Sequence, residues 1–262
     1  MAHKVYDNFV LENKIEDLLI TGIDLNTYMT IDYSLTDEPG MKKFVNVYTA
    51  TGNVEDLAMG EGNTDEIEVT WVQHEYEVGV TQGKFPYYDE QEMRDPMIVE
   101  TGLKGIAEKM TNDLTTKAIA EFGKATLTKT TNWDFETIVD AIALMNVEDE
   151  AGLFLLINPA EKATIRKNLK DELKYSEGFV RTGYIGSVAG VPVIASKAVP
   201  AGEGYLATKK AVTCFVKKGS EIEQKRDADT RKNEVFARKV MVVALTDGTK
   251  VVKLTNAVAD GE

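Results

Sequence analysis

Few side chains in this sequence have the chemistry of an acid–base or nucleophilic catalyst. The 262 residues include two histidines, His3 and His74, and one cysteine, Cys214. His74 alternates with acidic residues in a stretch predicted to be a strand, which favours a surface histidine over a general base. Cys214 lies in an apolar stretch, where a buried and inert thiol is the usual outcome. We expect no catalytic residue among these groups.

Motifs that bind cofactors, phosphates or metals are also missing. The sequence has no Gly-rich loop ending in Lys-Ser/Thr, no dinucleotide fingerprint and no His-Glu-x-x-His. A single cysteine excludes an intrachain disulfide framework and a cysteine metal cluster. Carboxylates are so abundant that the choice of a catalytic pair would be arbitrary. We therefore predict that the chain is not an enzyme and has no cofactor or metal ligands.

The charge balance argues against a nucleic-acid-binding protein. Lys and Arg number 30 against 43 Asp and Glu, a formal net charge of −13 that repels phosphate backbones. The N-terminus lacks the apolar run of a signal peptide, and no apolar segment approaches membrane-spanning length. The sequence thus predicts cytoplasmic synthesis and no membrane contact.

One long amphipathic helix is the strongest local signal. Asp95 can cap it, Pro96 suits its first position and Gly123 is a natural stop. Over this length an α-helix would extend roughly 40 Å. Gly102 and Gly105 permit either a bend or a close approach by another backbone. The apolar stripe consists of Val99, Leu103, Ile106, Ala107, Met110, Leu114 and Ala118.

Residues 44–83 alternate with period two, as in a half-exposed hairpin. The segment contains no Lys or Arg, and its eight acidic residues are Glu55, Asp56, Glu61, Asp65, Glu66, Glu68, Glu75 and Glu77. Because a two-stranded ribbon is only marginally stable alone, this pattern implies a basic partner surface. A solvated acidic loop is the alternative.

The N-terminal 44 residues contain short apolar clusters, a possible helix at 12–19 and the turn signal Asp37-Glu38-Pro39-Gly40. We interpret them as an arm that packs on something else, with a poorly ordered terminus as the alternative.

An α/β block follows a threonine-rich stretch at 124–132, which we predict to be a linker. Asp134 can cap a helix, and 153–157 is a continuous apolar run typical of a buried strand. A helix at 160–169, a loop at 175–190 and strands at 191–195, 205–207 and 212–216 complete a block at 133–216.

The tail from residue 217 concentrates basic residues between acidic ones. Apolar runs at 240–245 and 251–254 flank Asp247-Gly248 and predict a hairpin. The tail lacks the interleaved aromatic residues of a nucleic-acid-binding segment. The basic residues include Lys225, Arg226, Arg231, Lys232, Arg238 and Lys239.

This order of parts resembles the major capsid proteins of tailed phages and prophages of the Hong Kong 97 type. The run Gly183-Tyr184-Ile185-Gly186-Ser187-Val188-Ala189-Gly190-Val191-Pro192-Val193-Ile194 is similar to a stretch common in that family, as is Asn158-Pro159 after the buried strand. The resemblance implies an α+β fold in five parts. These are an N-terminal arm (1–44), an extended β-ribbon or E-loop (45–83), a P domain with a spine helix (84–132), an α/β axial or A domain (133–216) and a return to the P domain (217–262).

The resemblance also implies a function. Copies of the chain would assemble through pentamers and hexamers into an icosahedral shell that encloses phage double-stranded DNA without sequence-specific binding. The acidic ribbon would then lie across a neighbour's spine helix and basic P-domain surface, and Gly102 and Gly105 would let the spine bend before maturation. A portal and a separate scaffolding protein are the further expected partners, and the virion is the expected location.

Two family features do not carry over. Some members cross-link a ribbon lysine to an asparagine, but 44–83 has no lysine, so we expect no such bond. Too few residues precede the ribbon for a scaffolding segment of about a hundred residues, so we expect a separate scaffold or a chain that has lost it. An encapsulin-type nanocompartment shell that holds a cargo enzyme is the first alternative, and an acidic soluble α/β enzyme is the second.

Overall fold

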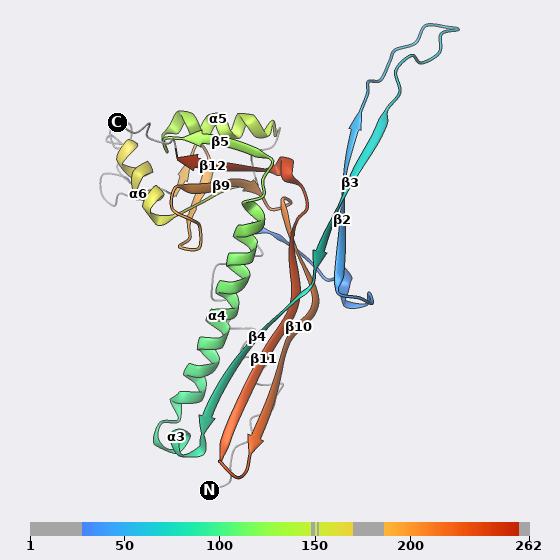
Figure 1. Ribbon diagram of the computed structural model, residues 1–262. Helices are drawn as coiled ribbons and strands as arrows, with labels where there is room; N and C mark the ends of the chain where they lie inside the picture. Colours follow the sequence, from blue (N-terminus) through green and yellow to red (C-terminus); the bar gives the residue numbers. More distant parts are fainter. Residues whose placement is uncertain (1–27, 148–149, 151, 170–185, 257–262) are drawn as a thin grey trace, which may run out of the picture.

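A computed structural model describes residues 28–147, 150, 152–169 and 186–256. The helix predicted at 12–19 and most of the loop predicted at 175–190 lie outside these residues. The described chain forms two sheets joined by one long helix, and a two-stranded ribbon projects away from them (Figure 1).

The long helix, α4, runs from Met97 to Phe122, so it begins one residue after the predicted first position, Pro96, and ends as predicted. The Asp95 carboxylate accepts a hydrogen bond from the Met97 N–H at 3.0 Å, which satisfies a free donor of the first turn. Six residues of the predicted stripe are buried and the seventh, Leu114, is partly buried. The helix ends at Gly123 in right-handed geometry, so this glycine stops the helix without the left-handed cap that glycine often provides.

A four-stranded sheet lies along α4 and has the order β1-β10-β11-β4. The helix packs on it through a cluster that includes Leu103, Ile106, Val235 and Ala237, and the short helix α3 (Asp89–Arg94) joins β4 to α4. The strands are β1 (Thr30–Asp32), β10 (Val212–Asp227), β11 (Lys232–Leu245) and β4 (Gly79–Tyr88).

A six-stranded sheet with the order β5-β12-β9-β6-β8-β7 forms the other half. Helices α5 (Phe135–Met145) and α6 (Pro159–Asn168) are capped by Asp134 and Asn158, whose side chains accept N–H groups of the first turn. The strands are β5 (Leu127–Thr131), β12 (Val251–Asn256), β9 (Glu203–Thr208), β6 (Leu153–Ile157), β8 (Val191–Ala195) and β7 (Ser187–Val188).

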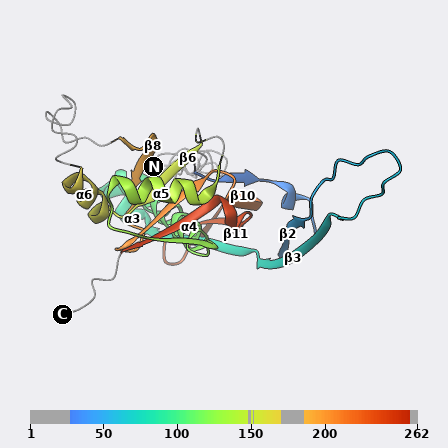
Figure 2. The same ribbon diagram turned by 90° about the horizontal axis from the view of Figure 1, so that it is seen from above.

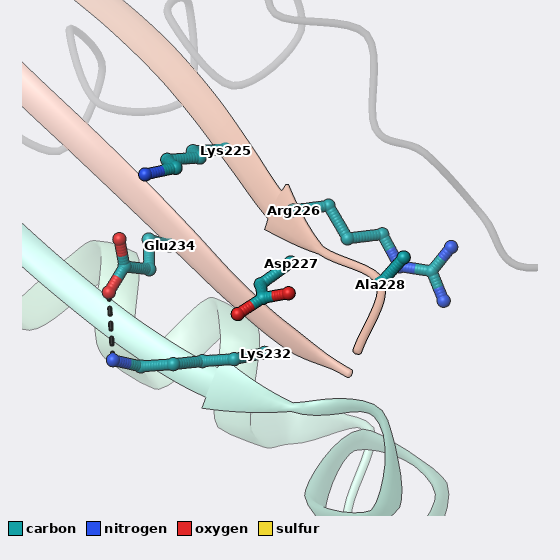
Figure 3. Close-up of a pocket in the computed structure, with 6 residues that line it drawn as sticks. All are labelled: Lys225, Arg226, Asp227, Ala228, Lys232 and Glu234. Carbon is teal, nitrogen blue, oxygen red and sulfur yellow. Dashed lines mark ion pairs between the residues drawn. The ribbon is translucent and has the colours of Figure 1, made fainter. Parts of the chain in front are cut away.

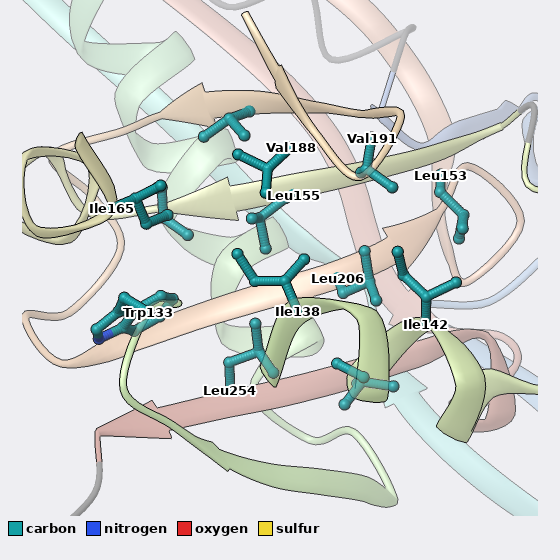
Figure 4. Close-up of a cluster of buried hydrophobic side chains, with 14 of the residues drawn as sticks. Trp133, Ile138, Ile142, Leu153, Leu155, Ile165, Val188, Val191, Leu206 and Leu254 are labelled. Carbon is teal, nitrogen blue, oxygen red and sulfur yellow. The ribbon is translucent and has the colours of Figure 1, made fainter. Parts of the chain in front are cut away.

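Both faces of strand β6 are buried, which explains why its sequence is a continuous apolar run. Leu153 and Leu155 pack with Ile138 of α5 and Leu206 of β9 in one cluster (Figure 4). Phe154 points into a second cluster, on the opposite face, that includes the last turn of α4 and parts of β10 and β11. This second cluster joins the two sheets into one core.

The threonine-rich stretch predicted to be a linker is in fact a strand. Residues 127–131 form β5, which pairs in parallel with β12. Threonine is β-branched and favours strands, but the partner lies far away in the sequence, so the local pattern could not reveal the pairing.

The hairpin predicted around Asp247-Gly248 is wrong, because β11 and β12 lie in different sheets. Tight hairpin turns need a positive φ, and Gly248 does not have one. Asp247 instead accepts the Thr249 N–H at 3.0 Å and starts a short 3₁₀ turn (Gly248–Lys250) from one sheet to the other. The hairpin of this region is formed by β10 and β11, with Arg231 at φ 52° in its turn.

The sheets also divide the chain differently from the predicted blocks. The strand expected at 212–216 belongs to β10 of the four-stranded sheet, and β5 and β12 enter the six-stranded sheet from outside 133–216. The two strands of the ribbon, β2 (Lys42–Thr51) and β3 (Glu68–Glu77), end before Gly79, where β4 begins. The two-stranded ribbon therefore spans 42–77 and not 45–83.

The two glycines of α4 lie in different surroundings, which gives the first testable prediction. A Cβ at Gly102 would collide with the ring of Phe85, which stacks on Tyr87 at 5.7 Å between centroids, whereas a Cβ at Gly105 would meet nothing within 4 Å. We expect Gly105→Ala to stabilise the chain by up to about 1 kcal/mol through helix propensity. Gly102→Ala should destabilise it by about 1–3 kcal/mol through overpacking.

Urea unfolding of the unassembled chain measures both effects, and each variant serves as the control for the other. A stabilisation of equal size in both variants would show that Phe85 yields freely and that Gly102 is not needed for packing.

Candidate assembly surface

The ribbon is a separate two-stranded sheet that projects from the body (Figures 1 and 2). Its strands pair antiparallel without a bulge, from Lys42 opposite Glu77 to Thr51 opposite Glu68. The loop at 52–67 connects them at the far end. The sequence predicted this antiparallel pairing from the period-two alternation.

The base of the ribbon is fixed to the body. Val45 and Val78 are buried with Leu35, Phe215 and Ala244 in a small core cluster. The Lys43 ammonium lies 4.9 Å from the centre of the Phe215 ring, a cation–π contact. The Val78 N–H donates to the Met41 carbonyl at 2.9 Å. Beyond this base the ribbon has no core of its own.

One face of the ribbon is aromatic and aliphatic, which the charge analysis of the sequence did not identify. Residues directly opposite in an antiparallel pair share a face, and so do residues two apart. Tyr48 faces Trp71 and Ala50 faces Val69, so these four side chains share one face. Tyr48 is 64% exposed and Trp71 is 57% exposed. Alternation of these side chains in both strands was the signal that could have revealed this face.

Exposed hydrophobic side chains are concentrated on the ribbon and its loop. Half of the large hydrophobic side chains that are exposed in the described chain lie between residues 42 and 77. Exposed apolar patches of this kind mark interaction sites in soluble proteins. Those on the ribbon and its loop are Phe44, Tyr48, Val54, Leu57, Met59, Ile67, Val69, Trp71 and Val72.

The eight acidic residues predicted as an assembly interface fall into two groups. Four of them are already engaged within the ribbon. Glu55 accepts hydrogen bonds from Thr64, which lower the pKa of its carboxyl, and Asp65 accepts the Asn53 N–H at 2.9 Å. Glu61 accepts the Ala58 N–H at 3.4 Å, and Glu75 pairs with Lys42.

The other four carboxylates, Asp56, Glu66, Glu68 and Glu77, are exposed and form no ion pair with any described residue. They are the part of the predicted acidic surface that remains available to a partner.

Four of the predicted basic residues, Lys225, Arg226, Arg231 and Lys232, lie near the tip of the β10–β11 hairpin, at the opposite end of the molecule from the ribbon (Figure 1). Arg238 and Lys239 instead lie opposite Gln82 and Thr81, near the start of β4 and the base of the ribbon. Arg226 pairs with Asp89 at 2.8 Å, and the Asn233 amide donates to the same carboxylate at 2.6 Å. Asp89 is only 8% exposed and fixes α3 to the hairpin, a role that the sequence did not indicate.

Most of the remaining basic residues are also paired within the chain. Arg231 contacts Glu90 at 3.4 Å, Lys232 contacts Glu234 at 2.8 Å (Figure 3) and Arg238 contacts Glu221 at 2.7 Å. Lys225 and Lys239 form no ion pair with any described residue. The hairpin therefore carries alternating charges instead of a uniform positive patch.

The groups considered for catalysis lie in unfavourable places. His74 is exposed on β3, and Cys214 is buried, which raises the pKa of its thiol to about 11. Among the described residues, no group of three or more His, Cys, Asp or Glu side chains could hold a metal ion. No described helix is long and apolar enough to span a bilayer.

Three comparisons with known proteins agree with each other. The model of a family described as "Phage capsid protein" matches residues 71–254. The major capsid protein of Staphylococcus phage phiMR11 is 29% identical over 119 residues, which are 44% of this chain and 43% of that protein. The match therefore spans less than half the length of this curated relative.

Solved capsid structures share the fold at low sequence identity. The capsid of cyanophage P-SCSP1u is 11% identical with a TM-score of 0.68, covering 88% of this chain and 86% of that chain. The head structure of Helicobacter pylori bacteriophage KHP40 is 12% identical with a TM-score of 0.67, covering 98% and 93%. A virus-like particle from Pyrococcus furiosus is 15% identical with a TM-score of 0.63, covering 95% and 100%.

The charge pairs of the hairpin predict a dependence of stability on pH. Lys232 and Lys84 both contact the Glu234 carboxylate and lower its pKa from 4.5 to about 2. Because the folded-state pKa is lowered, this carboxylate stabilises the fold above about pH 4.5, and the contribution is lost as the pH falls towards 2. We expect Glu234→Gln to have a lower melting temperature than the parent at pH 7 and the same melting temperature near pH 2.

Thermal unfolding followed by circular dichroism between pH 7 and 2 measures this convergence. Glu108→Gln, at an exposed glutamate of α4 that forms no ion pair with a described residue, is the control. Parallel curves for the parent and Glu234→Gln would contradict the assignment.

Proposed function

Because this chain belongs to the phage capsid protein family, we propose that it is the major capsid protein of a tailed phage or prophage. Copies of it would assemble through pentamers and hexamers into an icosahedral shell that encloses double-stranded DNA. The observation that carries this proposal is the ribbon, which exposes Tyr48, Val69 and Trp71, and no described part of its own chain covers these side chains.

The energetics of the ribbon favour contact with another copy. An isolated two-stranded sheet is marginal in water, and each large apolar side chain gains about 1.5–3 kcal/mol when it is fully buried. Burial of a few of these side chains against a neighbour offsets part of the entropy lost on association. Repetition of the same contact around a closed shell then stabilises the assembly without any single strong interface.

The charge of the chain suits a container for DNA. A net charge of −13 disfavours tight binding of the packaged phosphate backbone, so the shell would enclose DNA without reading its sequence. The unpaired carboxylates of the ribbon favour a positive surface on the partner and make the contact sensitive to salt.

The parts of the fold fit the roles that the Hong Kong 97 resemblance implies. We assign the ribbon at 42–77 to the E-loop, α4 with the four-stranded sheet to the P domain, and the six-stranded sheet to the A domain. The virion would be the final location after synthesis in the bacterial cytoplasm, with a portal and a scaffolding protein as further partners. The role is structural, with no catalytic residue, and a bend of the spine at Gly102 or Gly105 remains part of this proposal.

An encapsulin-type nanocompartment shell is the second candidate. It is favoured by the virus-like particle from Pyrococcus furiosus, because the similarity covers all of that chain and 95% of this one. Such a shell would hold a cargo enzyme instead of DNA. A soluble α/β enzyme is the third candidate and would form only a small discrete oligomer.

Electron microscopy of the particles, followed by analysis of their contents, separates these functions. We expect closed shells that, when isolated from a producing lysogen, protect DNA from nuclease and run as a single monomer band on a denaturing gel. A co-purifying enzyme without DNA would favour the nanocompartment. A small oligomer without particles at high concentration would overturn both shell functions, and a covalent ladder would overturn the expected absence of cross-links.

Reversal of the ribbon charge tests the electrostatic part of the proposal. We expect the replacement of Glu66, Glu68, Glu75 and Glu77 by lysine to leave the monomer folded and to lower the yield of closed shells at least ten-fold. The physical reason is that a positive ribbon would repel the surface that it now attracts. Sedimentation measures the shell yield, and circular dichroism measures the fold.

The same four positions changed to glutamine provide a matched control, because they remove charge without reversing it. An intermediate yield is expected for this variant. Normal shells from the lysine variant would show that ribbon charge does not direct assembly.

A further inference from the structure

The ribbon is joined to the body through a glycine at the root of each strand. Gly40 lies two residues before β2, and Gly79 lies two residues after β3. Gly40 has a φ of 104°, a conformation that residues with a Cβ rarely adopt. The Val78 N–H donates to the Met41 carbonyl between these connections. Because glycines absorb changes of φ and ψ easily, the connections alone do not fix the angle at which the ribbon leaves the body.

Within the described chain, the ribbon contacts the body only near its root. Lys43 lies opposite Tyr76 in the antiparallel register, and Val45 shares their face. Val45 is buried, and Lys43 and Tyr76 are partly buried. Farther along the same face, Thr49 and Thr70 are exposed. The direction of the ribbon therefore depends on a few contacts at one end of it.

The cross-strand pair at the root makes two cation–π contacts with the body, in opposite senses. The Lys43 ammonium of the ribbon lies 4.9 Å from the centre of the Phe215 ring of β10. The Lys124 ammonium of the body lies 5.4 Å from the centre of the Tyr76 ring of the ribbon. Both distances are short enough for a cation to be attracted by the face of an aromatic ring. These four residues form the root clasp: Lys43, Phe215, Tyr76 and Lys124.

The two body residues of the root clasp are themselves held in place. Phe215 is buried in the small core cluster at the base of the ribbon. Lys124 lies directly after the end of α4 and pairs at 2.6 Å with Glu121, whose side chain is largely buried. The Tyr76 hydroxyl also donates to the Leu245 carbonyl at the end of β11, at 3.5 Å. The root of the ribbon is therefore tied to α4, β10 and β11 together.

The length of the ribbon amplifies any change of angle at its root. From Asn46 to Thr51, β2 extends about 20 Å, at roughly 3.3 Å per residue. Over that length, a tilt of about 20° displaces the far end by about 7 Å. Contacts that fix the angle at the root therefore restrict the far end of the ribbon, although they cover little area.

We propose that the root clasp fixes the direction of the ribbon in the single chain, and that Gly40 and Gly79 form the hinge that it restrains. The clasp residues are positioning residues, because they act on the ribbon from its root. The clasp belongs to one chain and goes beyond the proposed function. A ribbon of fixed direction loses less conformational freedom when it meets a partner, and this consequence alone rests on the proposed function.

Distances between two spin labels in the unassembled full-length chain test the clasp. Labels at Thr70→Cys of β3 and Glu108→Cys of α4 report the direction of the ribbon, and both positions are exposed. Cys214 is buried, so the chain without added cysteines should take up no label. Pulsed electron paramagnetic resonance measures the distribution of distances. We expect a single narrow distribution in the labelled parent.

Removal of the two clasp cations should release the ribbon. We expect Lys43→Met with Lys124→Met to broaden the distribution at least two-fold, because methionine keeps the length of the side chain without its charge. Lys43→Arg with Lys124→Arg keeps both cations and should retain the parent width. Lys42→Met with Lys117→Met is the matched control, since these lysines lie on β2 and α4 and form ion pairs outside the clasp. We expect the parent width from it.

Changes at Tyr76 provide a second test that leaves both lysines in place. Lys43 also lies 3.4 Å from the Ser34 hydroxyl and 4.0 Å from the Glu38 carboxylate, and its replacement removes these contacts too. Tyr76→Leu removes the ring, whereas Tyr76→Phe keeps the ring and removes only the hydroxyl contact with Leu245. We expect broadening from Tyr76→Leu and the parent width from Tyr76→Phe. Circular dichroism verifies that each variant is folded.

A broad distribution in the labelled parent would overturn the clasp, and so would the parent width in the methionine pair at 43 and 124 or in Tyr76→Leu. Equal broadening in a control variant would overturn it as well. We further expect at least three-fold fewer closed shells from the methionine pair at 43 and 124 than from the Lys42 and Lys117 control. Absence of shells from the parent would overturn the proposed function, whereas the distances in the single chain decide the clasp.

Discussion

A two-stranded sheet cannot bury its own faces, and this constraint governs the molecule. The helix α4 covers one side of the four-stranded sheet, and the six-stranded sheet is buried on both sides at β6. The ribbon has neither kind of cover beyond Val45 and Val78 at its base. Its apolar side chains are therefore exposed in the single chain, and contact with a neighbouring copy is the proposed way to bury them.

Charge has a different role at each end of the molecule. On the hairpin of β10 and β11, acidic and basic side chains alternate and pair within the chain, and the largely buried Asp89 joins Arg226 and Asn233 to α3. Exposed pairs of this kind contribute little each, but together they leave the hairpin nearly neutral. On the ribbon, Glu66, Glu68 and Glu77 form no ion pair within the part of the chain that the structure describes. The sequence shows both sets of charged residues, but only the structure shows which of them form ion pairs within the described chain and which do not.

Local patterns were enough to predict the elements that depend on local physics. The stripe of α4, the Asp134 cap of α5 and the buried run of β6 follow from periodicity and capping. The alternation at 44–83 predicted the ribbon, although its last residues belong to β4. The failures are the long-range pairings. The pairing of β5 with β12 and the crossing of Asp247 between sheets depend on partners far away in sequence. The aromatic face of the ribbon was missed because the charges of the same segment dominated its interpretation.

The ribbon and β4 are separated by a single residue, Val78, and the ribbon continues the line of β4 (Figure 1). β4 is paired with β11 along its whole length, from Gly79 to Tyr88. A pull along the ribbon therefore loads this ladder in shear, so that all of its hydrogen bonds resist together instead of opening one after another. Tension applied at the tip of the ribbon is thereby distributed to the sheet beneath α4, and the pairing of β4 with β11 anchors the ribbon mechanically.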